Sequence, residues 1–171
     1  MDSRLQTADT PPSQEEMGVH TGIEDPQRQT LAEGLARVLA DTYTLLGKTH
    51  GFHWNITGPQ FHSLHEMFQV QYEDLTEAVD EVAERIRALG HFAPGSLSQF
   101  LKLSSLQDEH GVPDARGMLE QLVHDNETVV RACREVVRLA QDAGDTVTED
   151  LMNGRMNAHE KAAWMLRASI G

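Results

Sequence analysis

Apolar side chains recur every three or four residues along most of this chain, which is the spacing that places them on one face of an α-helix. The first such stretch begins at Asp25-Pro26, where Asp25 would cap the helix and Pro26 would take its first position. The spacing predicts a long helix from there toward Trp54. Its buried stripe would consist of Leu31, Leu35, Val38, Thr42, Leu45 and Thr49.

Three more long helices follow from the same spacing. The second comes after a break at residues 55–59 and ends at Gly90 in the position of a C-terminal cap; its stripe is Leu64, Phe68, Leu75, Val79, Val82, Ile86 and Leu89. The third runs from a cap at Asp114 to Gly144, with the stripe Leu119, Leu122, Val123, Val129, Val130, Cys133, Val136, Val137 and Ala140. The fourth begins at Thr146 to Glu149, which fit a capping box, and carries Leu151, Met152, Met156, Trp164, Met165 and Ile170.

The other segments complete one domain. Residues 96–106 predict a short helix inside the long connection between the second and third helices, and no stretch alternates as a strand would. We therefore predict an all-α fold over residues 25–171, a four-helix bundle with a short extra helix in that connection. Residues 1–24 are polar, contain Pro11-Pro12 and show no apolar period, so we expect a flexible acidic tail.

The composition limits the partners of this domain. The 171 residues carry 27 acids against 14 bases, a formal charge of -13, which opposes binding to the phosphates of nucleic acid and favours binding of cations. The alternative is that the charge only keeps the protein dispersed. One cysteine, Cys133, excludes an internal disulfide and lies in an apolar stripe. Without a leader-like or membrane-spanning apolar run, we expect a cytoplasmic protein with no membrane partner.

Histidines gather around the break between the first two helices. Residues 49–66, THGFHWNITGPQFHSLHE, hold four of the nine, namely His50, His53, His62 and His65. Farther along the second helix, Asp80 and Glu84 lie one turn apart on one face. Asp80 points in a direction similar to His65, but fifteen residues separate them along the helix by about 22 Å. One subunit therefore cannot bring these residues to a single metal ion.

A second copy of the chain removes this difficulty. If two copies of the second helix pair antiparallel about a midpoint near residues 74 and 75, His65 lies opposite Glu84, and residue 69 lies opposite Asp80. His53 can join from the end of the first helix. The outcome is a site of two histidines and two carboxylates shared between subunits, a ligand set that suits iron or zinc. The alternative is that Asp80, Glu84, Arg85 and Arg87 form a solvated charged face.

Two other kinds of site are disfavoured. A di-iron centre inside one bundle uses Glu-x-x-His pairs, and none of the nine histidines has an acid three residues before it. A nucleophilic hydrolase is also disfavoured, because Cys133 lies in an apolar stripe and the chain has no Gly-x-Ser-x-Gly elbow.

These residues resemble the Dps family of ferritin-like mini-ferritins. The resemblance covers residues 27–170 and rests on six stretches, which are His53-Trp54-Asn55, Thr57-Gly58-Pro59, Leu64 to Met67, Ala78 to Arg85, His159-Glu160-Lys161, and Trp164 to Ala168. It implies a hollow homo-dodecamer that oxidises Fe(II) with hydrogen peroxide or oxygen and stores Fe(III) mineral. It also implies that the ferroxidase ligands are His53 and His65 of one subunit with Asp80 and Glu84 of its mate.

The resemblance gives further residues an expected role. Trp54 resembles a family tryptophan thought to intercept radicals, or it is an aromatic anchor at a helix end. Where the family commonly places an acidic ligand, this chain has Gln69, whose amide brings no charge to a second cation. His50 and His62 each precede an expected ligand by three residues and are candidate additional ligands. By analogy, Glu149 and Asp150 are candidates to line an iron-entry pore.

The family also binds DNA in many cases through a lysine-rich tail. Here the 24-residue tail has Arg4 as its only base against five acids, so we do not expect direct DNA binding. Two alternatives to an iron-storing ferroxidase stay open. One is a DNA-compacting, nucleoid-associated protein; the other is a shell whose site prefers zinc, because Gln69 weakens the second iron position.

Overall fold

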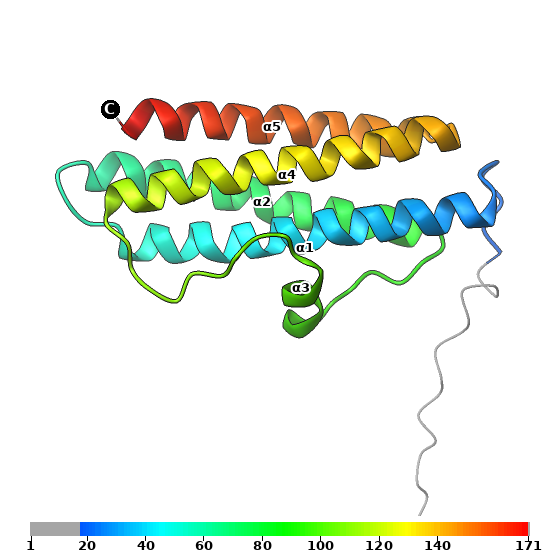
Figure 1. Cartoon of the computed structure of the whole chain (residues 1–171), viewed down its shortest axis with the longest axis horizontal. Helices are drawn as coiled ribbons and strands as arrows, with labels where there is room; N and C mark the ends of the chain where they lie inside the picture. The colour runs from blue at the N-terminus through cyan, green and yellow to red at the C-terminus, as the bar shows by residue number, and fades with distance from the viewer. Residues whose placement is uncertain (1–17, 171) are drawn as a thin grey trace, which may run out of the picture.

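The structure, a computed structural model, describes residues 18–170, in which there are five helices and no strand. Four long helices form a bundle: α1 (Asp25–Asn55), α2 (Phe61–Ala88), α4 (Ala115–Ala143) and α5 (Thr146–Ile170). The short α3 (Leu97–Leu103) lies on the outside of the bundle, on the long connection from α2 to α4 (Figure 1). The predicted all-α bundle with a short extra helix in this connection is confirmed.

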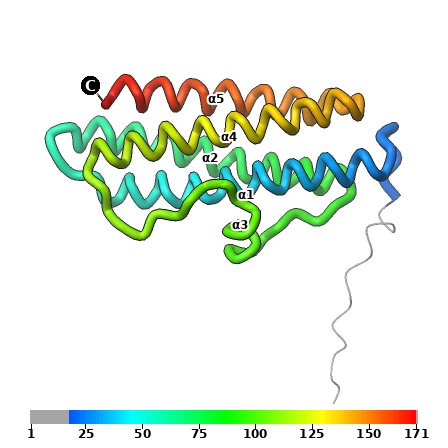
Figure 2. The backbone as a smooth tube through the Cα atoms, in the orientation of Figure 1, coloured from blue at the N-terminus to red at the C-terminus, as the bar shows by residue number. Residues whose placement is uncertain are grey.

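The direction of the helices decides which ends meet. The trace shows α1 and α2 running antiparallel, then a return along the bundle through α3, then α4 and α5 running antiparallel (Figure 2). As a result α2 is also antiparallel to α5, although more than fifty residues separate them along the chain. The turn between α1 and α2 contains Gly58 with φ +106°, a left-handed conformation that glycine adopts without strain.

The residues that end α4 are those that the sequence predicts, whereas the predicted N-caps of α1 and α5 are wrong by one residue. Asp114 Oδ1 accepts a hydrogen bond of 2.8 Å from the Gly117 amide at the start of α4, and Gly144 ends that helix with φ +67°. The capping box predicted at Thr146 is wrong. Asp145 caps α5 instead, since its Oδ1 accepts from the Thr148 amide at 3.0 Å. At α1 the N-cap is Glu24, one residue before the predicted Asp25.

The core follows the predicted stripes along α1, α2 and α4, and the prediction is less accurate for α5. Every member of the α1 stripe is buried, and Cys133 of α4 is fully buried as well. On α5, however, Trp164 is 63% exposed and Met165 is also at the surface. The inward face of α5 uses residues 152, 156, 159, 163 and 166, a helical spacing that leaves positions 164 and 165 turned away.

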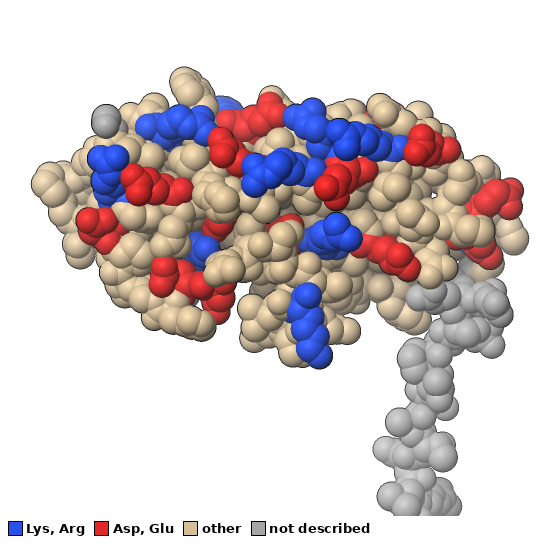
Figure 3. Space-filling model, viewed as in Figure 1, with Lys and Arg blue, Asp and Glu red and all other residues tan. Residues whose placement is uncertain are grey.

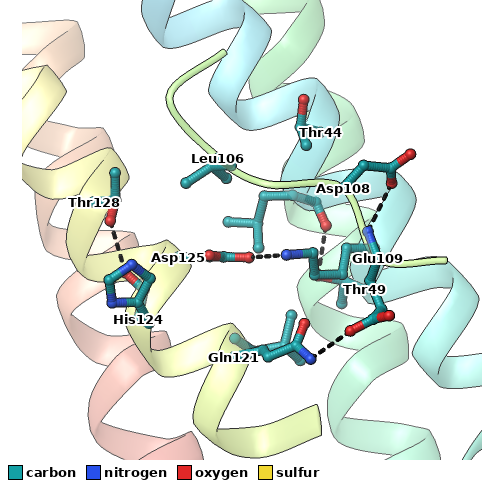
Figure 4. A network of polar contacts seen from close by, with 12 residues as sticks. Thr44, Thr49, Leu106, Asp108, Glu109, Gln121, His124, Asp125 and Thr128 are labelled. Atoms are coloured by element: carbon teal, nitrogen blue, oxygen red, sulfur yellow. Dashed lines mark hydrogen bonds and ion pairs between the residues drawn. The ribbon is translucent and has the colours of Figure 1, made fainter. Parts of the chain in front are cut away.

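Polar contacts fix the connection that crosses the bundle. The fully buried Asp41 of α1 accepts hydrogen bonds from the hydroxyls of Ser104 and Ser105, directly after α3. Farther along, Glu109 accepts from Gln121 at 2.7 Å, close to the buried ion pair of Lys48 Nζ and Asp125 Oδ2, also 2.7 Å (Figure 4). Because these buried groups have hydrogen-bond partners, they can fix the connection against the bundle without unsatisfied polar atoms of their own.

The chain before α1 is described only in part. Residues 1–17 lie outside the described residues, so the flexible acidic tail stays a prediction there. Residues 18–24 contact the bundle: Ile23 packs against the core, and the Arg28 guanidinium donates to the Val19 carbonyl. Within residues 18–170, no helix has the length and apolar character needed to cross a membrane.

Candidate metal centre

His53 and His65 hold each other at the turn between α1 and α2. His53 Nδ1 lies 2.9 Å from the carbonyl oxygen of His65, and His65 Nδ1 lies 2.8 Å from the carbonyl oxygen of His53. The two rings stack, with centroids 3.8 Å apart and an interplanar angle of 18°. The antiparallel return of the chain therefore brings both predicted histidine ligands together within one subunit.

These reciprocal hydrogen bonds determine the tautomer of both rings. A carbonyl oxygen can only accept, so each Nδ1 must carry the proton and donate it. In the neutral imidazole, the lone pair is then on Nε2. A histidine that donates through one nitrogen to a backbone carbonyl presents the other nitrogen as an oriented metal ligand. Both rings can therefore present Nε2 to a cation, and no group outside α1 and α2 is needed to orient them.

Two aromatic side chains that the sequence analysis missed surround this pair. Tyr72 meets the edge of the His53 ring at 5.1 Å between centroids, and Phe61 stacks on His65 at 5.2 Å. The signal was present in the spacing, because Phe61 lies four residues before His65 and Tyr72 lies seven after it on α2. These rings limit the orientations that the two imidazoles can adopt.

His50 takes part in a separate stack. Its ring lies 4.2 Å from the centroid of Trp54 and 4.2 Å from that of Tyr72, so it is packed between them. Its centroid is 6.2 Å from that of His53. Within the subunit His50 therefore supports the aromatic surroundings of the histidine pair. Trp54 itself is largely exposed, and its role stays a prediction.

The other candidates near the turn have partners of their own. His62 Nε2 lies 3.4 Å from Glu66, and its side chain is 83% exposed. Gln69 donates through Nε2 to Glu73 at 2.8 Å, which leaves its carbonyl oxygen as the group that could face a metal. Their metal-binding roles stay predictions, as does the role of His50.

Asp80 and Glu84 lie on the exposed surface of α2, away from the histidines. No group of three or more potential His, Cys, Asp or Glu ligands forms within the part of the chain that the structure describes. The alternative that Arg85 belongs to a solvated charged face with Asp80 and Glu84 does not hold for Arg85. Arg85 is mostly buried and donates to both carboxylate oxygens of Asp145 at 2.8 Å.

The Asp145 carboxylate anchors the end of α2 to the start of α5. Its burial alone would raise the pKa of the carboxyl, but hydrogen bonds from Thr148 and Arg85 outweigh this and hold the pKa below its ordinary value. Asp145 is therefore ionised at neutral pH and matches the Arg85 charge. This contact fixes Arg85, whereas Asp80 and Glu84 stay available at the surface.

The predicted pore residues lie at the beginning of α5. Glu149 Oε1 accepts a hydrogen bond of 2.7 Å from Gln141 of α4, and Asp150 is exposed. Whether they line a pore depends on contacts between subunits, so this assignment stays a prediction.

The comparisons with known proteins agree with this architecture. The model of the ferritin-like domain family matches residues 32–171. An uncharacterized low temperature-induced protein of Nostoc is 44% identical over 154 residues, covering 89% of this chain and 86% of that protein. DNA protection during starvation protein 2 of Bacillus anthracis is 38% identical over 138 residues, covering 81% and 94%.

A solved structure gives the same result. The Dps protein of Vibrio cholerae, described as a member of a superfamily of ferritin-like diiron-carboxylate proteins, superposes with a TM-score of 0.84. It is 34% identical, and the match covers 87% of this chain and 94% of that one. The fold and the histidine pair thus place the chain among ferritin-like proteins, and it belongs to the Dps family.

Proposed function

We propose that this protein is an iron-storage and detoxification protein that oxidises Fe(II), with hydrogen peroxide or oxygen, at centres shared between two subunits. His53 and His65 come from one subunit, and Asp80 and Glu84 from its mate. The Fe(III) produced is stored as mineral inside a hollow homo-dodecamer. The observation that carries this proposal is the histidine pair, whose reciprocal Nδ1 hydrogen bonds leave both Nε2 atoms for a metal. No third His, Cys, Asp or Glu completes a ligand group with this pair among the described residues.

The order of residues along α2 supports its pairing with the α2 of a second subunit, which the shared centre requires. In the register that sets His65 opposite Glu84, the numbers of any two residues that lie opposite each other add up to 149. None of the seven acids of α2 then lies level with an acid of the mate; the acids are Glu66, Glu73, Asp74, Glu77, Asp80, Glu81 and Glu84. A shift of this sum to 150 would set Glu66 opposite Glu84, and a shift to 148 would set Asp74 opposite itself. Like charges in direct contact destabilise an interface.

An apolar contact fits the same register. Val70 is 67% exposed on α2, and it would lie opposite the partly buried Val79 of the mate. Burying such a side chain stabilises an association by about 1.5 kcal/mol or more. The register therefore joins metal ligands, avoids acid pairs and covers an exposed valine at once.

The chemistry needs two Fe(II) ions for each peroxide. Each Fe(II) gives up one electron, and one hydrogen peroxide takes both together with two protons and leaves as two waters. The two carboxylates lower the net charge of the bound dications, and the histidines add nitrogen ligands that carry no charge. The carboxylates therefore also favour binding of the more highly charged product state. Gln69 adds an oxygen without charge, so we expect the second ion to be held less firmly.

Iron is better supported than zinc. The diiron-carboxylate description belongs to the Vibrio cholerae neighbour, and it extends to this chain through the shared family. Nothing in the comparisons supports zinc as the physiological metal. Zinc binding to the same four residues would show as inhibition of iron oxidation.

Protection of DNA would follow from iron removal and would not require contact with DNA. Several curated relatives are named DNA protection during starvation proteins. On this chain, basic side chains over α4 and α5 alternate with acidic ones (Figure 3). Arg134 pairs with Glu160 at 3.1 Å, and Arg167 pairs with Glu127. A face whose bases are neutralised in this way offers little to phosphates, and a cytoplasmic location fits both roles.

Two measurements on the purified protein test the proposal together. Light scattering should give about 230 kDa, since twelve subunits of 19.0 kDa form the closed shell. Stopped-flow absorbance should show Fe(II) oxidation that is much faster than the reaction without protein. A stable monomer would contradict the shared centre. A dodecamer without oxidation would instead leave the assembly intact and refute the ferroxidase activity.

A further inference from the structure

Four buried side-chain nitrogen atoms lack a hydrogen-bond partner within the described part of the chain, Arg28 Nε of α1 and three others that belong to α2 and α5. These three are Gln71 Nε2 of α2 and, on α5, Arg155 Nε and His159 Nε2. Each atom is shielded from solvent, and the His159 residue is only 2% exposed. A buried polar atom without a partner destabilises the fold, and the large majority of buried side-chain polar atoms in proteins have a partner.

An ion pair between α2 and α5 brings the three atoms to one level of the bundle. Asp74 accepts from the two terminal nitrogens of Arg155, at 3.3 and 2.7 Å, which leaves Nε as the free donor of that side chain. Gln71 lies three residues before Asp74 on α2, and His159 lies four residues after Arg155 on α5. Since α2 and α5 are antiparallel (Figure 2), Gln71 and His159 lie toward the same end of the bundle from this ion pair, by about 4.5 and 6 Å along the helix axes.

The contacts of Asn126 decide which proton His159 carries. Asn126 Nδ2 donates to the Leu122 carbonyl at 2.7 Å, so its Oδ1 is the acceptor that lies 2.8 Å from His159 Nδ1. His159 Nδ1 must therefore carry a hydrogen, and Nε2 has a lone pair. Burial, together with the charge of Arg155, lowers the pKa of His159 to about 3, and the ring is neutral at pH 7.

The three unpartnered atoms thus consist of two donors and one acceptor. One water molecule matches this set, because its oxygen can accept from Gln71 and Arg155 while one of its hydrogens is donated to His159. Buried waters in proteins typically make about three hydrogen bonds. A metal cation does not match, because Arg155 and Gln71 both direct hydrogens toward the position. An anion does not match either, since it would face the lone pair of a neutral imidazole.

We propose that the bundle contains a built binding site for one water molecule, held by Gln71 Nε2, Arg155 Nε and His159 Nε2. The water bridges α2 to α5 and, through His159 and Asn126, to α4. All three nitrogens belong to one subunit, so the water site needs no ligand from a second subunit. Its role is to complete the hydrogen bonding of a polar layer that would otherwise destabilise the bundle.

The test is diffraction from crystals of the assembled protein at a resolution that shows ordered waters. We expect a peak within about 3.2 Å of all three nitrogens in every subunit. Gln71→Leu removes one donor at similar size and should abolish or displace the peak. Gln121→Leu is the matched control, because its amide bonds to Glu109 in the outer connection, and it should leave the peak unchanged.

Three outcomes would overturn the proposal. One is wild-type density in which the three nitrogens bond directly to protein atoms and no peak lies between them. Another is a peak that contacts only one of the three. The third is an anomalous bromide signal at this position in crystals grown with bromide, which would identify a halide site. Persistence of an unchanged peak in Gln71→Leu would also remove Gln71 from the site.

Discussion

His53 and His65 each donate a ring N–H to the backbone carbonyl of the other, across the turn that joins α1 to α2. This reciprocal arrangement fixes both tautomers and both ring orientations before any metal binds. A ligand pair that is ordered in advance loses little conformational entropy on binding. The turn between α1 and α2 is short, and each histidine lies near the helix end that adjoins it, so the two rings can reach each other.

The first prediction concerns the ligands on each side of the proposed centre. His65→Ala removes a nitrogen ligand, and Glu84→Ala removes a carboxylate that the mate would supply. Each should slow peroxide-driven Fe(II) oxidation at least tenfold, which corresponds to a rise of about 1.4 kcal/mol in the activation free energy. Stopped-flow absorbance measures the rate, and His110→Ala is the control because its side chain is 91% exposed in the connection.

Mixed assemblies sharpen this test. A shell that combines His65→Ala subunits with Glu84→Ala subunits forms dimers in which one centre lacks both ligands and the other centre retains both. Partial recovery of the rate on mixing would support ligands from two subunits. Two variants that both retain the dodecamer and the full wild-type rate would show that these residues do not bind the iron that reacts.

The second prediction concerns Gln69. Gln69→Glu places a negative charge where the residue would lie opposite Asp80 of the mate, and a charge there should strengthen the binding of a second Fe(II). An anaerobic Fe(II) titration should give one tightly bound ion for each wild-type centre and two for the variant. The new carboxylate also lies one turn from Glu73, which Gln69 now contacts, so Glu73→Gln in the same background controls for that repulsion. Two tight ions in the wild type would refute the assignment of position 69.

The third prediction is a loss of stability in acid that depends on His159. In the folded protein the pKa of His159 is about 3, whereas an unfolded histidine has a pKa near 6.5. Below pH 6.5 the unfolded chain binds a proton that the folded chain does not. Stability is therefore complete above about pH 6.5 and falls by about 1.4 kcal/mol per pH unit for each subunit as the pH drops toward 3.

Urea unfolding at several pH values measures this dependence. His159→Gln removes the titrating ring and keeps a polar group that can contact Asn126. The variant should be less stable at pH 7 and should lose less stability than the wild type between pH 6.5 and 4. Parallel pH profiles for the two proteins would show that His159 does not contribute.

The fourth prediction concerns DNA. A formal charge of -13 on every subunit should prevent DNA binding near neutral pH and at physiological salt. A gel-shift assay in metal-free buffer should show free plasmid at all protein concentrations. Retention that appears only with added magnesium would agree with a bridge of metal ions. Tight retention in metal-free buffer would support the DNA-compacting alternative.

The sequence predicts much of the fold because local spacing and caps determine it. The three- and four-residue intervals identify all four long helices, and Gly144 and Asp114 mark the ends of helices by chemistry that needs no distant partner. The error at α5 concerns one residue. Asp145 caps the helix in place of Thr146 through the Thr148 amide, and Arg85, sixty residues earlier, also bonds its carboxylate.

The sequence proposes a set of candidate ligands, but it does not determine their geometry. Helix rise alone showed that His65 and Asp80 lie too far apart for one ion. The reciprocal hydrogen bonds of His53 and His65, and the insertion of His50 between Trp54 and Tyr72, depend on how α1 packs against α2. No spacing along the chain contains that information.

The most direct test of the shared centre is a crystal structure of the protein after anaerobic soaking with Fe(II), with anomalous data collected at the iron edge. We expect an iron peak bound by His53 Nε2 and His65 Nε2 of one subunit and by Asp80 and Glu84 of its mate, across a twofold axis near residues 74 and 75. Iron bound only by residues of a single subunit, or no iron at the His53 and His65 pair, would contradict the account.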